Sequence, residues 1–191
     1  MGNNPRLKEI LDSRREEYLK PLLDLISLDT HCIGHGIKGG LEKSGQDYMA
    51  ALLTSLGADV RLADMNEADI QKAITLYQEG NPGHDYKDRF NVYGFFPGGG
   101  GRSLMFNGHM DTMPAEKERW SLPPHTPTLK DGKLYGLGAS DMKAGLMGAV
   151  RAVKLLKDAG IPLPGEVVIT SVADEEGGGN GSIAAAMQGL K

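Results

Sequence analysis

Residues 140–178, SDMKAGLMGAVRAVKLLKDAGIPLPGEVVITSVADEEGG, decide the fold of this 191-residue chain. The first half of the stretch predicts a long helix, because apolar residues recur along it at helical spacing. Gly160 and Pro162 then end that helix. Residues 166–171 form a β-branched run bounded by glycine, which is typical of a strand buried on both faces. A helix that leads directly into such a strand indicates an α/β sheet.

The same alternation extends over the rest of the chain. Apolar periodicity predicts further helices over residues 7–27 (with a break at Pro21), 41–56, 69–77 and 180–187. Strands are predicted over residues 58–62, 91–96 and 103–107, the last two as neighbours, and Asp131-Gly132 predicts a hairpin over residues 126–135. Short links between these elements predict a three-layer αβα architecture around a mostly parallel central sheet.

Composition excludes several classes of function. The formal net charge is -4 and no basic stripe is present, which argues against nucleic acid as a partner. Cys32 is the single cysteine, so we expect no disulfide framework, and one thiol fits a reducing compartment. The N-terminus shows no signal-peptide pattern, and no stretch approaches the length of a membrane-spanning helix. We therefore expect a soluble, cytoplasmic protein without a membrane partner.

Reactive side chains follow the apolar runs at three places. The first is His109-Met110-Asp111, directly after the strand predicted over residues 103–107. Side chains two positions apart in an extended segment point the same way, so Asp111 can accept the free N–H of the imidazole. The other ring nitrogen of His109 is then available to a metal ion. The alternative is a buried histidine with a purely structural hydrogen bond.

The second place is Asp141, which precedes the long helix. A carboxylate with both oxygens available can bridge two cations. The alternative is that Ser140 and Asp141 cap the helix and complement its dipole.

The third place is Glu175-Glu176, just after the strand predicted over residues 166–171. Adjacent side chains diverge, so we assign Glu176 as a metal ligand and Glu175 as the general base that moves protons. The alternative is a charged surface turn, to which Asp174 contributes a third acid. Because sites in α/β sheets form beyond the carboxyl ends of strands, we expect His109 and Glu175 at one edge of the sheet.

Several motifs together resemble the co-catalytic zinc metallopeptidase family of aminoacylases, acetylornithine deacetylase, succinyl-diaminopimelate desuccinylase and carboxypeptidase G. The motifs are GHMDT (108–112), Trp120 with Pro123-Pro124, DGKLYGLGASDMKAG (131–145) and ADEEG (173–177). The resemblance covers roughly residues 48–191 and is specific in the second half of the chain. It implies a zinc-peptidase-like fold.

The resemblance also implies roles for individual residues. His109, Asp141 and Glu176 would bind metal, with Asp141 as the bridge, Glu175 as general base and Asp111 as the residue that orients His109. The implied cofactor is a pair of Zn²⁺ ions, for which Co²⁺ or Mn²⁺ could substitute. A cis peptide bond between Asp141 and Met142 is implied as well.

The chain departs from this family pattern at its C-terminal end. The family has two further ligands downstream, an acidic residue and a late histidine, and an inserted lid and dimerisation domain. Residues 1–191 are therefore expected to be the N-terminal portion of a catalytic domain, truncated before these parts. His31, His35, His84 and His125 could in principle replace the missing imidazole, although surface histidines are the simpler interpretation.

The resemblance predicts a hydrolase of amino-acid metabolism that cleaves N-acyl amino acids or small peptides by attack of hydroxide bound to two zinc ions. The full-length protein would be the active enzyme, and the 191-residue chain alone is expected to be inactive. Two alternatives remain: a non-catalytic fragment with an incomplete metal site, and a lidless dizinc aminopeptidase. An open sheet edge also predicts self-association, as a dimer or another homo-oligomer.

Overall fold

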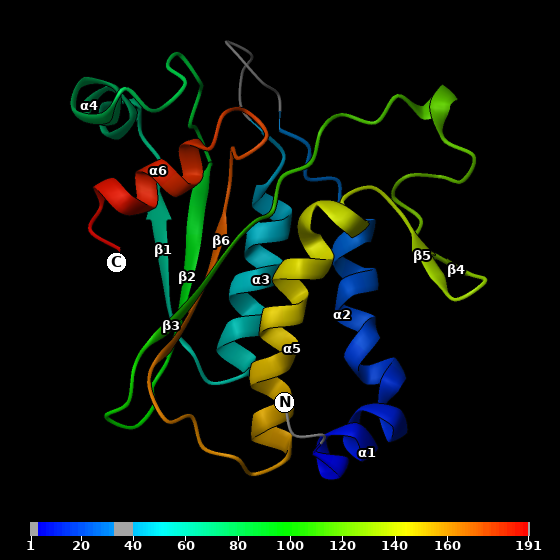
Figure 1. Cartoon of the computed structure of the whole chain (residues 1–191). Coiled ribbons are helices and arrows are strands. Elements are labelled where there is room, and N and C mark those ends of the chain that lie inside the picture. Colours follow the sequence, from blue (N-terminus) through cyan, green and yellow to red (C-terminus); the bar gives the residue numbers. More distant parts are fainter. Residues whose placement is uncertain (1–3, 33–39, 191) are drawn as a thin grey trace.

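A four-stranded sheet forms the centre of the molecule in a computed structural model that describes residues 4–32 and 40–190. Its strand order is β1-β2-β6-β3 (Figure 1). The strands are β1 (Asp59–Asp64), β2 (Phe90–Phe96), β3 (Leu104–His109) and β6 (Val167–Val172). The β3–β6 pair is parallel, whereas β1–β2 and β2–β6 are antiparallel. The α/β class is therefore confirmed, and the sheet is mixed where a mostly parallel one was predicted.

Helices cover both faces of this sheet (Figure 1). On one face, α3 (Lys43–Ser55) packs on β1 and β2, and α5 (Ala144–Asp158) packs on β3 and β6. Outside α5 lie α1 (Pro5–Ser13) and α2 (Arg15–Ser27). On the other face, α6 (Asn180–Met187) contacts β2 and β6, with α4 (Glu67–Tyr77) beside it. The three-layer αβα architecture is thus confirmed.

The main core lies between the sheet and the helices α3 and α5. Leu53, Val92, Val150 and Ile169 are fully buried there. Each such side chain contributes about 1.5–3 kcal/mol through removal from water. All six residues of β6 are buried, because helices cover this strand on both sides. The β-branched run therefore has the environment that the sequence predicts.

The order of the strands differs from the prediction at one place. Strands β2 and β3 were expected as neighbours, but β6 lies between them. The reason is burial: all six residues of β6 are buried, as a central position allows, whereas Leu104 and Phe106 of β3 remain partly exposed at the edge. The crossover through α5 also makes the β3–β6 pair parallel.

The first helical segment breaks at Arg14, where φ is -123° and ψ is 28°, and Pro21 lies inside α2. The predicted break at Pro21 is therefore wrong. Tertiary contacts outweigh the local effect of proline, since α1 and α2 both pack on α5.

Glu17 of α2 forms ion pairs with Arg14 and Lys154, and their hydrogen bonds lower the pKa of the Glu17 carboxyl to about 2.

Two smaller features complete the fold. Strands β4 (Thr128–Lys130) and β5 (Lys133–Tyr135) form the predicted hairpin, with positive φ at both Asp131 and Gly132. A short 3₁₀ turn, η1, spans Lys117–Arg119, and a π-helical turn, η2, spans Ala139–Lys143. In residues 4–32 and 40–190, no helix combines the length and the apolar character that a bilayer crossing requires.

Candidate metal centre

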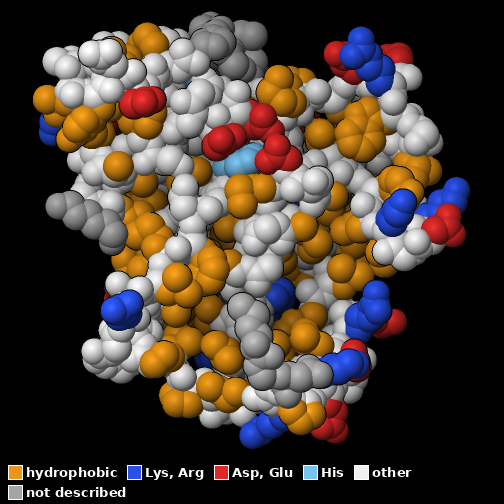
Figure 2. Space-filling view, in the orientation of Figure 1, with side chains coloured by type: hydrophobic (Ala, Val, Ile, Leu, Met, Phe, Trp, Pro, Cys, Tyr) orange, Lys and Arg blue, Asp and Glu red, His pale blue; other side chains and the backbone are white. Residues whose placement is uncertain are grey.

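The three predicted ligands come together at the carboxyl edge of the β3–β6 pair. His109 is the last residue of β3 and lies in register with Val172 at the end of β6, so residues 174–176 follow beside it. Ligand atoms of His109, Asp141 and Glu176 all lie within 4.8 Å of one another. Figure 2 shows acidic side chains gathered around a histidine on this face of the molecule. The predicted convergence is thus a feature of the fold.

The imidazole of His109 is buried and fixed in orientation. Its Nδ1 donates to the backbone carbonyl oxygen of Asp111 at 2.9 Å, while a carboxylate oxygen of Asp111 is 3.6 Å away. Asp111 therefore orients the ring mainly through its main chain. Nε2 faces the acidic side chains and lies 3.0 Å from Asp141 Oδ1. Burial lowers the pKa of His109, but Asp111 and Asp141 outweigh this and raise it to about 9.

Asp141 lies in η2 and projects into the cluster instead of capping α5. No side chain caps the N-terminus of α5, and Asp141 has an extended backbone conformation. The helix-cap alternative for Ser140 and Asp141 is therefore excluded. The peptide bond between Asp141 and Met142 is cis, as the resemblance implied.

Lys143 anchors the same turn to the end of α2, a role that was not predicted from the sequence. Its side chain is buried, and Nζ donates to the carbonyl oxygens of Leu25 and Leu28, each at 3.0 Å. Leu25 lies in the last turn of α2 and Leu28 is its C-cap residue, and the Leu25 carbonyl also accepts from the backbone N–H of Leu28 at 3.3 Å. Burial lowers the pKa of Lys143 to about 8. Lys143 thereby ties the turn that carries Asp141 to the helical layer.

The two adjacent glutamates occupy different environments. The backbone N–H of Glu176 donates to Asp111 Oδ2 at 2.9 Å. Burial raises the pKa of the Glu176 carboxyl; His109 opposes this effect, and nearby carboxylates such as Asp141 reinforce it. Glu175 Oε2 lies 3.7 Å from His109 Nε2, and its side chain is 45% exposed. One glutamate is therefore held within the cluster, and the other reaches its open side.

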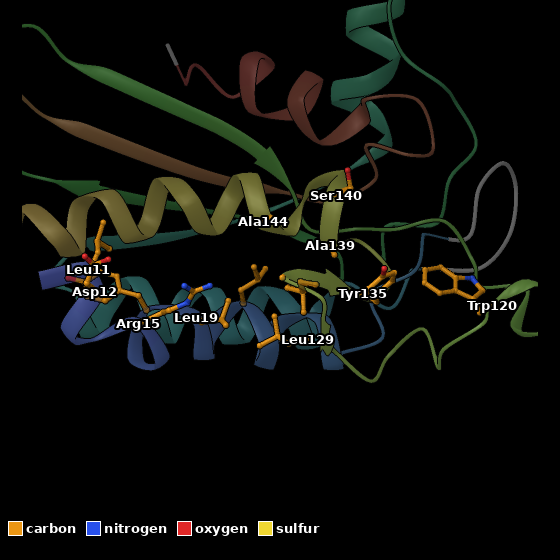
Figure 3. Close-up of a pocket in the computed structure, with 15 residues that line it drawn as sticks. Leu11, Asp12, Arg15, Leu19, Trp120, Leu129, Tyr135, Ala139, Ser140 and Ala144 are labelled. Atoms are coloured by element: carbon orange, nitrogen blue, oxygen red, sulfur yellow. The ribbon is translucent and has the colours of Figure 1, made fainter. Parts of the chain in front are cut away.

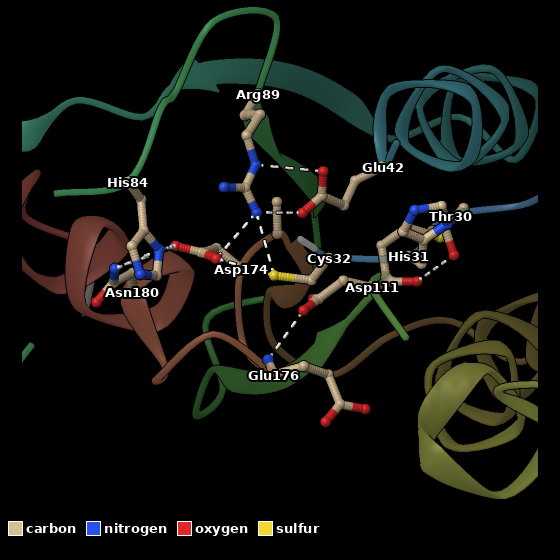
Figure 4. A network of polar contacts seen from close by, with 12 residues as sticks. Thr30, His31, Cys32, Glu42, His84, Arg89, Asp111, Asp174, Glu176 and Asn180 are labelled. Carbon is tan, nitrogen blue, oxygen red and sulfur yellow. Dashed lines mark hydrogen bonds and ion pairs between the residues drawn. The ribbon is translucent and has the colours of Figure 1, made fainter. Parts of the chain in front are cut away.

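Asp174 is not part of a charged surface turn. It is fully buried, and its carboxylate accepts hydrogen bonds from Arg89, Asn180 and Cys32 (Figure 4). It also contacts Nδ1 of His84 at 2.6 Å. The surface-turn alternative is therefore wrong for this residue. The signal that could have indicated burial is its position two residues after a fully buried strand.

The other histidines do not supply a ligand in the described part of the chain. His84 is buried against Asp174, so the expectation of a surface histidine is wrong there. His31 and His125 both lie near Asp29, with ring nitrogens 2.8 and 3.8 Å from Oδ1. None of the three joins a group of potential metal-binding atoms. His35 lies outside the described residues.

A separate groove of about 730 Å³ runs between α1, α2 and the β4–β5 hairpin (Figure 3). Its lining is mainly apolar and includes Leu11, Leu19, Trp120 and Tyr135. Ser140, next to Asp141 in the sequence, also lines the groove, but the acidic side chains of the cluster do not. The cluster of His109, Asp141 and Glu176 therefore lies outside this groove.

The structure thus combines an α/β sheet with one imidazole and several carboxylates at the carboxyl edge of two parallel strands, a set of donor atoms that suits a metal ion. Residues 105–191 match the model of Peptidase family M20/M25/M40. The resemblance inferred from the sequence is thereby confirmed for residues 105–191.

Curated relatives extend the similarity over most of the chain. The chain is 31% identical over 184 residues to N-formyl-4-amino-5-aminomethyl-2-methylpyrimidine deformylase of Bacillus subtilis, an alignment that covers 96% of this chain and 38% of the deformylase. It is 36% identical over 89 residues to succinyl-diaminopimelate desuccinylase of Dechloromonas aromatica, covering 46% of this chain and 24% of that enzyme. The chain thus spans well under half the length of these relatives.

Solved structures show the same fold. Human carnosine dipeptidase 1 superimposes with a TM-score of 0.71 at 22% identity, over 94% of this chain and 36% of the dipeptidase. An M20 family metallo-carboxypeptidase from Sulfolobus solfataricus gives a TM-score of 0.63 at 20% identity, over 84% of this chain and 31% of that protein. At these identities the likeness concerns the fold alone.

Proposed function

We propose that the protein containing this chain is a metal-dependent amide hydrolase that removes the acyl group from N-acyl amino acids or cleaves small peptides. The observation that carries the proposal is the convergence of His109, Asp141 and Glu176 at one edge of the sheet, with Glu175 on the open side. The names of the two curated relatives, a deformylase and a desuccinylase, support the removal of an acyl group from nitrogen.

The residues of the cluster fit a divalent cation. His109 Nδ1 is committed to a carbonyl oxygen, so Nε2 is the nitrogen that can bind metal. Asp141 and Glu176 bring like charges close together, which is unfavourable unless a cation or a proton lies between them. His109, Asp141 and Glu176 would hold the ion. We propose a zinc pair with Asp141 as the shared ligand, and Co²⁺ or Mn²⁺ as substitutes.

A metal ion at this position would supply a Lewis acid, which can polarise a carbonyl group and make water more acidic. Glu175 is the residue proposed to move the proton. Its carboxylate is half exposed beside His109, so it can reach a water molecule that approaches from solvent. The water oxygen bonds to the acyl carbon, the C–N bond breaks, and Glu175 passes the proton to the leaving nitrogen. The products are a carboxylate and an amine.

Further parts of the proposal concern the whole protein. The 191-residue chain contains three of the expected ligands, so we propose that activity requires the longer protein and that the chain alone is inactive. The domain organisation inferred from the sequence, a catalytic portion followed by a lid and a C-terminal segment, belongs to the same proposal.

Two further features bear on location and assembly. The buried thiol Cys32 supports a cytoplasmic location. The partly exposed edge strand β3 supports a homo-oligomer.

Replacement of Glu175 by Gln in the longer protein tests this function, because the substitution keeps the shape of the side chain and removes the base. The assay measures kcat/KM for N-formyl and N-succinyl amino acids with Zn²⁺ or Co²⁺ present. We expect a loss of about 10²–10⁴-fold in Glu175→Gln. Glu116→Gln, at an exposed acid outside the cluster, is the matched control and should retain activity. Near-normal turnover by Glu175→Gln contradicts the proposed role, and preference for free-amine peptides favours an aminopeptidase.

A further inference from the structure

A buried cluster of charged side chains adjoins the turn that carries Glu175 and Glu176, and within it Arg89 contacts Glu42, Cys32 and Asp174 (Figure 4). The guanidinium group contacts both carboxylate oxygens of Glu42, through Nε at 3.2 Å and through Nη2. Nη2 also donates to Asp174 Oδ1 at 2.9 Å. All three side chains are at most 1% exposed. One planar group therefore joins the start of α3 to the turn that follows β6.

This cluster is not a second metal site, although potential ligand atoms of Cys32, Glu42 and Asp111 lie within 4.8 Å of one another. Glu42 is already bound through both oxygens by Arg89. The thiol of Cys32 donates to Asp174 at 3.1 Å, and burial raises its pKa, so it stays protonated. The cation that balances these acids is the guanidinium group itself.

Asp174 controls the direction in which the chain leaves β6. It has a left-handed backbone conformation, with φ at 58°, which is uncommon outside glycine. Arg89 holds one carboxylate oxygen, while His84 at 2.6 Å and Asn180 at 3.1 Å contact the other. With the carboxylate held on both sides, the next two residues are directed toward His109.

We propose that Arg89 is a positioning residue for the metal centre: by joining Asp174 to Glu42 it fixes the turn that presents Glu175 and Glu176 to the ion. This inference rests on the proposed function, because the turn has this role only if the cluster binds metal. A lysine cannot reproduce the arrangement. Its ammonium group is a point charge on a flexible stem, whereas the contacts to Glu42 and Asp174 use several N–H groups of one rigid plane.

The first test is a Co²⁺ titration of the 191-residue chain, followed by visible absorption, which reports the geometry of the ligands. We expect Arg89→Lys to bind Co²⁺ about tenfold more weakly or worse, with a changed spectrum, as is usual when support for ligands is lost. Arg151→Lys is the matched control, since Arg151 is a partly buried arginine of α5 whose charged neighbours are Glu17 and Asp158. It should bind Co²⁺ like the wild type. Unchanged affinity and spectrum in Arg89→Lys overturn the inference.

A second readout needs no metal. The backbone amide of Glu176 donates to Asp111, so its hydrogen exchange, measured by NMR, reports how firmly the turn is held. We expect faster exchange in Arg89→Lys and wild-type exchange in Arg151→Lys. Absence of Co²⁺ binding in the wild type refutes the proposed metal centre, and unchanged exchange of Glu176 refutes the positioning by Arg89. The two failures are therefore distinguishable.

A double variant guards against misfolding. If circular dichroism shows that Arg89→Lys is unfolded, Arg89→Met combined with Glu42→Met removes both buried charges and keeps their volume, which proteins often tolerate. The Asp174 carboxylate then keeps its contacts with His84 and Asn180. We expect weaker Co²⁺ binding and faster exchange at Glu176 in this variant. A folded double variant with wild-type values on both readouts overturns the inference.

Discussion

Gln46 of α3 joins the helical layer to the sheet just behind the candidate site, and replacing it by Met should destabilise the fold strongly. Its side chain is fully buried. Nε2 donates to the carbonyl oxygens of Phe90 at 3.0 Å and of Ser171 at 2.9 Å, and Oε1 accepts from the Ser171 hydroxyl at 2.6 Å. The amide of Gln46 therefore bonds to both β2 and β6, and its contact on β6, Ser171, lies three residues before Asp174.

Methionine fills nearly the same volume, so the expected effect comes from lost hydrogen bonds and not from a cavity. The substitution takes away the acceptor of the buried Ser171 hydroxyl and one donor from each of the two buried carbonyls. Each such group costs about 1–3 kcal/mol when it is left without a partner. We expect a loss of about 3–6 kcal/mol in the free energy of unfolding, a large part of the usual total of about 5–15 kcal/mol.

Urea unfolding of Gln46→Met, followed by circular dichroism, measures this loss. Gln71→Met is the matched control, because Gln71 lies on the exposed side of α4 and its amide contacts Glu67. It should change stability by less than about 0.5 kcal/mol. Ser171→Ala in the Gln46→Met background should cost less than in the wild type, since the hydroxyl has then already lost its acceptor. A loss below about 1 kcal/mol in Gln46→Met refutes the reasoning.

Three further predictions concern charge, packing and the sheet edge. The carboxyl pKa of Glu17 is lowered in the fold, so its ion pairs stabilise the protein above pH 4.5, and this contribution is lost as the pH falls toward 2. Over that range, urea titrations should show the free energies of unfolding of the wild type and of Glu17→Gln converging. A constant difference between the two contradicts the prediction. A Cβ at Gly181 would lie 2.0 Å from the carbonyl oxygen of Ala173, so Gly181→Ala should lower the free energy of unfolding by about 1–3 kcal/mol, measured by thermal unfolding. Gly148→Ala is the control, because no atom lies close to a Cβ at that position. Light scattering should show self-association that Leu104→Lys weakens, and a monomer at all concentrations opposes this.

The sequence predicts most elements of this fold because their signals are local. The apolar run of β6, the Asp131-Gly132 hairpin and the last helix each depend on neighbours within a few residues, and all three are confirmed. The predicted convergence of His109 and Glu175 needed one further rule, that sites form at the carboxyl edge of such a sheet. That rule holds here because β3 and β6 are parallel neighbours.

What the sequence did not reveal depends on contacts between distant segments. Arg89 and Asp174 are 85 positions apart, and neither has a motif that announces the other. From the sequence alone, Asp174 therefore also fits the alternative of a charged surface turn, and a surface histidine is the simpler interpretation of His84. The break at Arg14 has the same origin, since it follows from packing of two helices on α5 and not from the proline nearby.

Zinc binding by the 191-residue chain tests the central claim most directly. Isothermal calorimetry with Zn²⁺ should show binding that His109→Ala, Asp141→Asn and Glu176→Gln each weaken by at least about tenfold, since each removes one ligand. His125→Ala, which removes an imidazole outside the cluster, should leave the affinity unchanged. Zinc affinity that survives all three ligand substitutions, or that depends on His125 instead, contradicts a metal centre at this edge of the sheet.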